Sequence, residues 1–156
     1  MEAKFIKGGQ GNVWTGQIEN MRQLQYMLWP RTMAIAECLL SPKEKKNWDS
    51  FAKKVESHFE RLDIRQIKYA RSMFDPIIHV KRNSKDSIQV ELSTEVKGLE
   101  IYYSFDNSNP DEYYPKYESM LSIPKESSML KIITYRQGKP IGRQLDIPVA
   151  ELRKRK

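Results

Sequence analysis

The hydrophobic period of the sequence changes near Pro76, and this change constrains the fold more than any other feature. Before Pro76, apolar residues recur at the spacing of one helix face. After it, apolar and polar residues alternate in short runs between turn residues, which is the pattern of half-buried strands. The sequence therefore predicts an α+β protein that begins with helices and continues as a small antiparallel β-sandwich.

Helical character is expected over residues 20–40, with an interruption at Trp29-Pro30. Proline lacks a backbone donor and restricts the residue before it, so one short helix should end there and a new one should start at Pro30. Ile35 and Cys38 fall on one face of that second helix. This spacing predicts that Cys38 is a small buried apolar residue.

A longer amphipathic helix is expected from Pro42 to about Leu62. Ser41 suits the capping position, Pro42 suits the first helical position, and Glu44 stands three residues after the cap. Residues 64–75 are expected to form a connector. The apolar stripe of the helix consists of Trp48, Phe51, Ala52, Val55, Phe59 and Leu62.

The second half predicts short strands separated by turns. The strands are expected at residues 77–81, 87–92, 99–105, 120–123, 129–135 and 141–149. Turn residues gather at 83–86, 106–110 and 136–139. We therefore divide the chain into a helical part with its connector at 1–75, a β-sandwich domain at 76–150 and a basic tail at 151–156.

The start of the sequence has the character of a strand without partners. Phe5 and Ile6, followed by Gly8 and Gly9, resemble the end of a buried strand, but the helical half offers no second strand. A lone strand leaves its backbone donors and acceptors unpaired. We therefore expect the chain to be the last part of something longer, starting in mid-domain.

Composition excludes several classes of site. The hydrophobic and charged contents, 39% and 30%, fit a globular protein rather than a disordered one. Cys38 is the single cysteine, so neither an internal disulfide nor a zinc site of paired cysteines is expected. His58 and His79 are the two histidines and offer little for a histidine-rich site. No metal and no cofactor is therefore predicted.

The net charge of +7 is concentrated at the end of the chain, where residues 153–156 are all basic. A terminal basic run is usually solvated, whereas nucleic-acid binders carry a basic stripe across a folded face. No apolar run approaches the roughly 20 residues of a membrane helix. Residues 1–10 contain no apolar core of a secretory signal. Neither a nucleic-acid nor a membrane partner is therefore expected.

Two segments of the helical half resemble a known family. One is Gly-Gly-Gln-Gly-Asn-Val-Trp-Thr at 8–15, and the other is Trp-Pro-Arg at 29–31 followed by Ala-Ile-Ala-Glu at 34–37. In this order and spacing they resemble the end of the catalytic domain of family 20 glycoside hydrolases, the β-N-acetylhexosaminidases. The first is similar to the eighth strand and loop of that (β/α)8 barrel, and the second to its eighth helix. The helix from Pro42 to Leu62 resembles the helix that follows.

The β half resembles the small domain that follows the barrel in bacterial members of this family. Residues 98–142 contain a strand, an aspartate turn at Asp106 and then Asn109-Pro110, which is the signature of that domain. The resemblance covers nearly the whole chain. It implies the terminal strand and helices of a (β/α)8 barrel, followed by a small antiparallel immunoglobulin-like β-sandwich.

The family removes terminal N-acetylglucosamine or N-acetylgalactosamine from glycans, so the resemblance implies such glycans as partners of the full-length enzyme. Its chemistry is substrate-assisted, because the acetamido oxygen attacks the anomeric carbon. The Asp-Glu pair that orients this group and supplies the acid lies earlier in the barrel. In this chain Asp111-Glu112 falls in a loop of the β half and is interpreted as a solvated turn. The resemblance therefore implies a structural chain, without catalytic residues and inactive alone.

Trp14 is the one substrate-binding candidate. It matches the family's tryptophan at the barrel rim, which packs against the sugar ring, and a flat aromatic wall suits the apolar face of a pyranose. Without the resemblance, a core tryptophan is the favoured interpretation. Two residues later the family has a glutamate that hydrogen-bonds sugar hydroxyls, whereas this chain has Gly16. Gln17 and Glu19 are the candidates to replace that glutamate.

Other polar and aromatic residues have structural interpretations. His79 is expected to pack or to lie at a strand edge, and His58 to face solvent or pack. Arg31 and Glu37 are expected to form salt bridges. Several tyrosines suggest an aromatic glycan-binding surface, although strand alternation sends the first two to opposite faces. These are Tyr102, Tyr103, Tyr113, Tyr114 and Tyr117.

Two hypotheses stay open. In the first, the chain is a fragment of a hexosaminidase, and apolar surface exposed where the barrel is missing promotes self-association. In the second, it is a stand-alone β-sandwich module that binds carbohydrate or protein, and it is compact and monomeric. Relatives are often periplasmic, surface-attached or secreted, but the localisation of this chain is not predicted.

Overall fold

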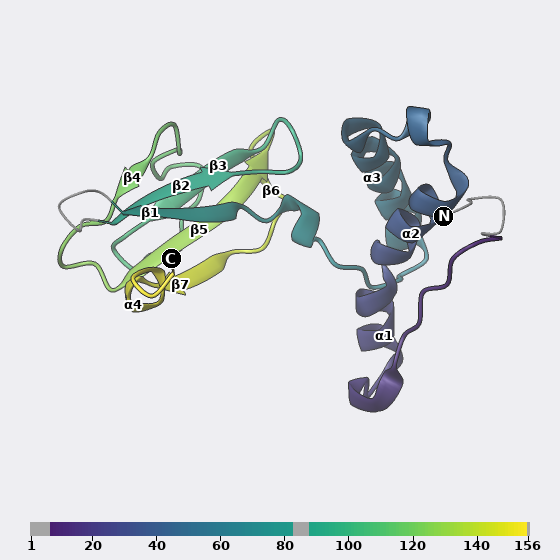
Figure 1. Ribbon diagram of the computed structural model, residues 1–156. Helices are drawn as coiled ribbons and strands as arrows, with labels where there is room; N and C mark the ends of the chain where they lie inside the picture. Colours follow the sequence, from purple (N-terminus) through teal and green to yellow (C-terminus); the bar gives the residue numbers. More distant parts are fainter. Residues whose placement is uncertain (1–6, 83–87, 156) are drawn as a thin grey trace. The chain divides into compact units, whose positions relative to one another are not determined.

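The computed structural model describes residues 7–82 and 88–155 (Figure 1). The chain divides into two compact units, Met1–Ala70 and Arg71–Lys156, called here the helical unit and the β unit. The expected strand end at Phe5-Ile6 and the expected turn at 83–86 lie outside the described residues. The prediction of an α+β protein with antiparallel sheets is confirmed, and each unit is described below by itself.

The helical unit contains three α-helices in its described part. They are α1 (Met21–Leu28), α2 (Arg31–Leu40) and α3 (Trp48–Ile64), with short 3-10 turns η2 (Thr15–Gln17) and η3 (Lys43–Lys45). The predicted interruption between the first two helices is confirmed at Trp29 and Pro30. Asn20 begins α1, because its side chain accepts a hydrogen bond of 2.9 Å from the Gln23 N–H.

The predicted start of the long helix is wrong. Ser41 ends α2 instead of beginning α3, since its N–H donates to the Glu37 carbonyl at 3.2 Å. The chain then passes through η3, and α3 begins only at Trp48. The cap is Asn47, whose side chain accepts a 3.0 Å hydrogen bond from the Ser50 N–H. The asparagine cap therefore replaces the capping box that the sequence offers earlier.

The core of the helical unit is small and centres on α3. The predicted stripe is confirmed at Ala52, Val55, Phe59 and Leu62, which are buried. Phe59 stacks on Tyr69 with ring centroids 4.1 Å apart, and the Ala70 N–H donates to the Trp29 carbonyl at 2.9 Å. These contacts fold the segment after α3 back onto the helices.

Neither α1 nor α2 contains a buried residue. The predicted burial of Cys38 is therefore wrong, because its side chain is exposed. Ile35 and Leu39, which share its helix face, are 41% and 49% exposed. The face is covered only in part by the glycine-rich segment before α1, and this leaves the thiol in solvent.

The β unit contains two antiparallel sheets (Figure 1). The first has the order β1-β2-β4, and the second has the order β3-β5-β6 with β7 also paired to β5. The strands are β1 (Ile77–Arg82), β2 (Ile88–Ser93), β3 (Glu100–Ser104), β4 (Leu121–Ser122), β5 (Met129–Arg136), β6 (Lys139–Pro140) and β7 (Leu145–Pro148). A 3-10 turn, η4 (Ser72–Phe74), precedes them, and a short helix, α4 (Val149–Leu152), follows.

Both sheets and α4 contribute side chains to one core. Its buried members are Val90, Leu92, Ile101, Leu121, Leu130, Ile132, Ile147 and Leu152. They alternate along β2 and β5 with less buried residues, as predicted for half-buried strands. The β unit therefore closes a core from its own residues.

Residues 72–75, predicted as connector, pack on the β unit. The Thr134 hydroxyl donates to the Phe74 carbonyl at 2.7 Å in a buried position. Gly142 lies beside this bond, and a Cβ there would stand 2.1 Å from Thr134 Oγ1. Arg143 Nε and Nη2 donate to one carboxylate oxygen of Asp75 at 3.0 and 2.6 Å.

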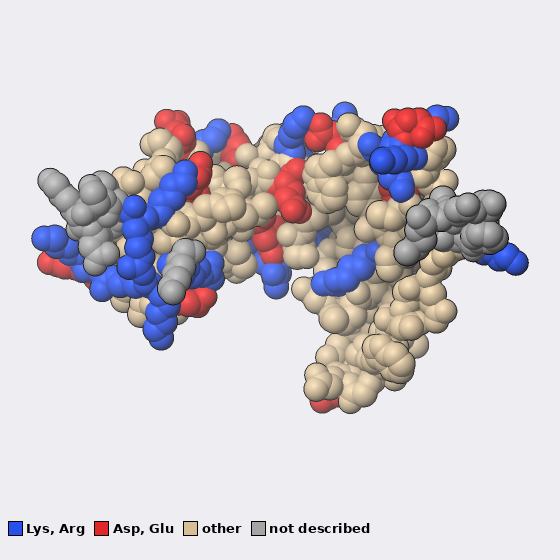
Figure 2. Space-filling model, in the orientation of Figure 1, with Lys and Arg blue, Asp and Glu red and all other residues tan. Residues whose placement is uncertain are grey.

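The basic residues at the end of the chain follow a folded segment as far as Arg155. Leu152 is fully buried, and Arg82 Nη2 donates to the Arg153 carbonyl at 2.6 Å. Figure 2 shows Lys and Arg side chains gathered over the region of α4 and the neighbouring end of β1. The backbone of 153–155 is therefore held on the β unit, while its side chains are exposed.

Candidate functional site

The Trp14 side chain is 85% exposed and precedes the turn η2. Gln23 of α1 fixes the C-terminal end of this turn, because its Nε2 donates to the Gln17 carbonyl at 3.2 Å and its Oε1 accepts from the Glu19 N–H at 3.0 Å. The ring is therefore not a core residue. It projects from a short turn that is anchored to a helix.

The glycines before Trp14 allow the chain to cross α2 at close range. A Cβ at Gly9 would stand 2.7 Å from Leu39 Cδ2, and a Cβ at Gly11 would stand 2.8 Å from Ile35 Cδ1. Real side chains do not reach such distances without a shift of the neighbour. Close approach to α2 therefore accounts for small residues at Gly9 and Gly11, although the atoms they meet are the ends of flexible side chains, and it does not account for Gly8, which meets no atom within 4 Å.

Gly16 lies in open space, since no atom comes within 4 Å of a Cβ built there. Packing therefore does not require glycine at this position, and a longer side chain fits. Gln17 and Glu19, the candidates to replace the missing glutamate, are both exposed on the same turn segment. The sugar-binding role of Trp14 remains a prediction on this geometry.

Arg31 and Glu37 take partners other than each other. Arg31 Nη1 donates to the carbonyls of Tyr26 and Met27, both at 3.0 Å, and so satisfies the C-terminal end of α1. Glu37 pairs with Lys54 of α3 at 3.2 Å. The salt bridge expected for Glu37 thus forms with α3, while Arg31 bonds backbone carbonyls.

An apolar pocket of about 250 Å³ lies between α2 and the start of α3. Its walls include Ala34, Cys38, Trp48 and Phe51, and Glu37 lies among its lining residues. The pocket suits an apolar group by shape.

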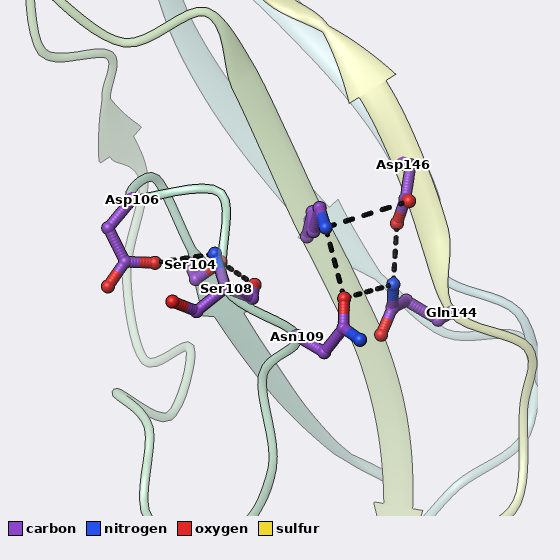
Figure 3. Close-up of polar contacts among 7 residues, drawn as sticks. Ser104, Asp106, Ser108, Asn109, Gln144 and Asp146 are labelled. Atoms are coloured by element: carbon purple, nitrogen blue, oxygen red, sulfur yellow. Dashed lines mark hydrogen bonds and ion pairs between the residues drawn. The ribbon is translucent and has the colours of Figure 1, made fainter.

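The β unit carries its polar cluster in the loop after β3 (Figure 3). The Ser108 N–H donates to Asp106 at 3.0 Å, and the Ser104 hydroxyl donates to the Ser108 carbonyl at 2.6 Å. The Ser108 N–H holds the pKa of the Asp106 carboxyl below its usual value. This is the aspartate turn that the sequence predicts at 106–110.

Asn109 ties this loop to β5 and to the segment before β7 (Figure 3). Its Oδ1 accepts from Lys131 Nζ of β5 and from Gln144 Nε2 just before β7, both at 3.0 Å. Gln144 Nε2 also donates to Asp146 Oδ1 at 2.8 Å. Sequence reasoning missed Lys131, Gln144 and Asp146, since they are far from Asn109 along the chain. The turn residues Asn109 and Pro110 were the sequence signal that could have pointed to this cluster.

Asp111-Glu112 forms a turn at the surface. The Tyr113 N–H donates to Asp111 Oδ1 at 2.9 Å, and the Tyr114 N–H donates to the Asp111 carbonyl at 3.1 Å. The Asp111 carboxylate thus serves its own loop, and Glu112 is exposed. This geometry agrees with the interpretation of a solvated turn.

The structure divides the candidate tyrosines into two groups. Tyr103 and Tyr117 pack against the core of the β unit. Tyr102 lies on the opposite face of β3 and contacts Tyr135 edge to face, with centroids 5.2 Å apart. Tyr113 is 88% exposed. A single aromatic surface of all five predicted tyrosines is therefore excluded.

The candidate metal ligands are scattered. Among the described residues, no three His, Cys, Asp or Glu side chains gather in a way that could hold a metal ion. His58 on α3 and His79 on the edge strand β1 are both exposed. Within the same residues, no helix combines the length and apolar character needed to cross a membrane.

Two family models match the chain, one in each unit. Residues 1–43 match "Glycosyl hydrolase family 20, catalytic domain", and residues 90–143 match "Fn3 associated". The first match contains Trp14 and the glycine-rich segment. The second contains the aspartate turn and Asn109. The order of the two matches is the order that the resemblance to the family implies.

Two curated relatives are named beta-hexosaminidase. The protein from Porphyromonas gingivalis is 25% identical over 140 residues, which cover 86% of this chain and 17% of that protein. The protein from Akkermansia muciniphila is 35% identical over 57 residues, which cover 36% of this chain and 12% of that protein. The chain thus spans less than a fifth of the length of either relative.

Proposed function

We propose that this chain, which carries the C-terminal part of a family 20 glycoside hydrolase sequence, serves as the structural end of a β-N-acetylhexosaminidase. Such an enzyme releases terminal N-acetylhexosamine from glycans. The observation that carries the proposal is the ordered pair of family matches, over residues 1–43 and 90–143. On this proposal, the helical unit ends the (β/α)8 barrel and the β unit is an immunoglobulin-like accessory domain.

The chain alone is expected to be inactive. Family 20 chemistry requires an adjacent Asp-Glu pair, and the one such pair here, Asp111-Glu112, is a turn whose aspartate bonds its own loop. No cofactor enters the proposal. The test is hydrolysis of a chromogenic N-acetyl-β-glucosaminide by the purified chain beside the Porphyromonas gingivalis beta-hexosaminidase. Turnover by the chain would overturn the proposal.

Trp14 is the residue proposed to contact the sugar. Its 85% exposure and anchored turn support this role, because an open aromatic ring on fixed backbone can stack on a pyranose. The test places residues 1–156 in the relative in place of its matching segment. In that chimera Trp14→Ala should lower kcat/KM about tenfold, whereas Trp48→Ala, a half-exposed ring in the same unit, should change it much less.

Gly16 offers a gain-of-function test of the same site. Because the space around it is open, Gly16→Glu introduces the acceptor that the family has there. A hydrogen bond to a charged group is worth about 1.5–3 kcal/mol, so kcat/KM in the chimera should rise. Gly16→Gln is the uncharged control and should give a smaller rise. Equal kcat/KM values for the two variants would show that a charged acceptor at position 16 does not bond the sugar.

Self-association is proposed for the isolated chain, because α1 and α2 leave apolar side chains exposed. Met21 of α1 is 65% exposed and Leu40 of α2 is 82% exposed. Sedimentation velocity over a concentration series tests this. A monomer at all concentrations would favour the second candidate function, a stand-alone module that binds through its β unit.

A further inference from the structure

Residues 153–155 belong to the fold of the β unit. Their N–H groups donate to backbone carbonyls of α4, at 3.0 Å from Arg153, 3.0 Å from Lys154 and 3.3 Å from Arg155. The helix itself is anchored in the core, because Leu152 is fully buried and Val149 is 3% exposed. The basic run therefore continues α4 by a further turn and has a fixed backbone, although its side chains are exposed.

Arg82 brings a fourth cation to the same place from a separate segment of the chain. It ends β1, and its Nη2 donates to the Arg153 carbonyl at 2.6 Å. Figure 2 shows Lys and Arg side chains gathered in this region. Residues of one helical turn lie closer together than the Debye length of about 8–10 Å, so their charges act on a partner together. We call this group the basic cluster, and its members are Arg82, Arg153, Lys154 and Arg155.

The basic cluster keeps an excess of positive charge. Glu151, which pairs with Arg155 at 2.7 Å, is the one carboxylate among the described residues of α4 and the turn after it. Four cations against one carboxylate leave an excess of three. The neighbouring residues add charges of both signs in equal number, namely Lys81 with Glu91 and Lys125 with Glu126. By sequence, residues 83–87 contain one lysine and one aspartate and leave this excess unchanged.

The form of the basic cluster favours a flat anionic partner. The described residues of α4 and its following turn include no aromatic ring, whereas proteins that bind single-stranded nucleic acid stack bases on such rings. With four residues, two of them buried, α4 cannot enter the groove of a duplex. The cluster lies at one end of the β unit (Figure 1) and is not a stripe along it. A plane of lipid phosphates suits such an end, because guanidinium groups bind phosphate oxygens in pairs.

We propose that the basic cluster docks the β unit on membrane surfaces that contain anionic phospholipids. The expectation of no membrane partner rests on a solvated terminal run, and the fixed turn at 153–155 removes that premise. The contact is electrostatic and lies at the surface, so it needs no helix that crosses the bilayer. The proposal goes beyond the proposed function and is independent of it, because it involves neither sugar contact nor the barrel.

The experiment is co-sedimentation of the full chain with vesicles. Vesicles of phosphatidylcholine with about 30% phosphatidylglycerol are compared with vesicles of phosphatidylcholine alone. The neutral vesicles measure adsorption through the exposed apolar side chains of the helical unit, which does not require charge. We expect at least about tenfold stronger binding to the anionic vesicles at about 0.05 M salt, and loss of this difference at about 0.5 M salt.

A pair of double variants locates the contact. Each basic residue near an anionic surface raises the affinity roughly fivefold, so Arg153→Gln with Lys154→Gln should lower binding to the anionic vesicles about 25-fold. Lys43→Gln with Lys45→Gln removes the same charge from exposed positions in the helical unit and should lower it less than about twofold. A dispersed amide spectrum of each variant confirms that the exposed changes preserve the fold.

Three results would overturn the proposal. The first is equal binding to the neutral and the anionic vesicles at low salt. The second is an equal loss of binding in the two double variants, which would show that net charge matters and the basic cluster does not. The third is binding to heparin without binding to anionic vesicles at the same salt concentration, which would assign the cluster to a soluble polyanion.

Discussion

The helical unit and the β unit bury their apolar side chains to different extents. Most of the large apolar side chains that are exposed among the described residues lie in the helical unit. Those of the helical unit are Val13, Trp14, Met21, Met27, Ile35, Leu39, Leu40, Trp48 and Ile64. Those of the β unit are Ile77, Tyr113 and Met120. The β unit has two sheets that face each other and so can close a core. Two of the three α-helices of the helical unit have no such facing layer.

The difference in burial indicates which unit needs a further layer to cover its apolar side chains. An amphipathic helix gains stability chiefly by burying its apolar face, and α1 and α2 bury none of their residues fully. The β unit buries Leu130, Ile132 and Leu152 completely. The chain therefore combines one self-sufficient unit with one that presents apolar surface for a further layer, as the proposed barrel would supply.

The two units also carry separate spectroscopic probes. All three tryptophans, Trp14, Trp29 and Trp48, lie in the helical unit. Tryptophan fluorescence thus follows that unit alone, whereas the resolved amide signals of residues 88–155 follow the β unit. The predictions below use this separation during urea unfolding, and the first three each compare one position in each unit.

The largest effect is expected from Leu130→Ala in the β core. Leu130 is fully buried, so the change should cost about 2–5 kcal/mol of the free energy of unfolding of the β unit. Leu40→Ala, on a side chain that is 82% exposed, should stay within about 0.5 kcal/mol. Similar costs at the two positions would mean that Leu40 is buried in solution, and the contrast between the units would fail.

Gly142→Ala should have the second largest effect. The added Cβ would stand 2.1 Å from Thr134 Oγ1 and 3.0 Å from the Phe74 carbonyl oxygen, so the buried hydrogen bond between those groups must shift. We expect a loss of about 1–3 kcal/mol in the β unit. The matched change Gly16→Ala in the helical unit meets no atom and should be nearly neutral. A tolerated Gly142→Ala would show that residues 72–75 are not fixed on the β unit.

Two ion pairs give a finer comparison. Asp75 accepts from the backbone N–H and the side chain of Arg143, and its side chain is 10% exposed. Asp75→Asn should therefore cost about 1 kcal/mol, by urea unfolding of the β unit. Glu37→Gln removes a single lysine contact in the helical unit and should cost less than about 0.5 kcal/mol. Added salt should reduce the difference between the two costs. A larger cost for Glu37→Gln than for Asp75→Asn would contradict the conclusion that the Asp75–Arg143 pair contributes more to stability.

The smallest effect concerns alkaline pH and Tyr135. Because burial raises the pKa of this phenol, the β unit keeps the associated stability below the ordinary tyrosine pKa of about 10 and loses it as the pH rises through the folded value. Unfolding midpoints between neutral pH and pH 11 should therefore fall less for Tyr135→Phe than for the natural chain. Tyr113→Phe, at an exposed ring, is the control and should follow the natural chain.

The sequence predicted the elements that depend on local pattern. The buried stripe of α3, most strands of the β half and the turn at 106–110 are read from residues close together in the chain. The last predicted strand, 141–149, is shorter in the structure, where β7 spans Leu145–Pro148, and β6 (Lys139–Pro140) begins inside the turn predicted at 136–139. The predicted start of α3 was wrong because the sequence offers two capping residues. Asn47, rather than Ser41, accepts the hydrogen bond from the first turn of the helix. The predicted burial of Cys38 was wrong because periodicity shows which residues share a helix face, not whether another element covers that face.

Long-range contacts within the β unit could not be predicted from local sequence patterns. Asn109, Lys131 and Gln144 meet only because β5 and the segment before β7 pass the same loop, and no local pattern links them. The division of the tyrosines followed from strand alternation for Tyr102 and Tyr103. The burial of Tyr135 did not follow from it, since alternation assigns this side chain to the face turned away from the core, yet it is only 8% exposed.

The packing of residues 72–75 determines where this chain can be divided for transplantation into other proteins. A graft that begins at the change in hydrophobic period, Pro76, would carry Thr134 without its acceptor and Arg143 without its carboxylate. It would also lose Phe74, over which the Arg136 guanidinium lies at 5.8 Å from the ring centroid. The portable module therefore begins at Arg71, several residues before the point at which its first strand becomes visible in the sequence.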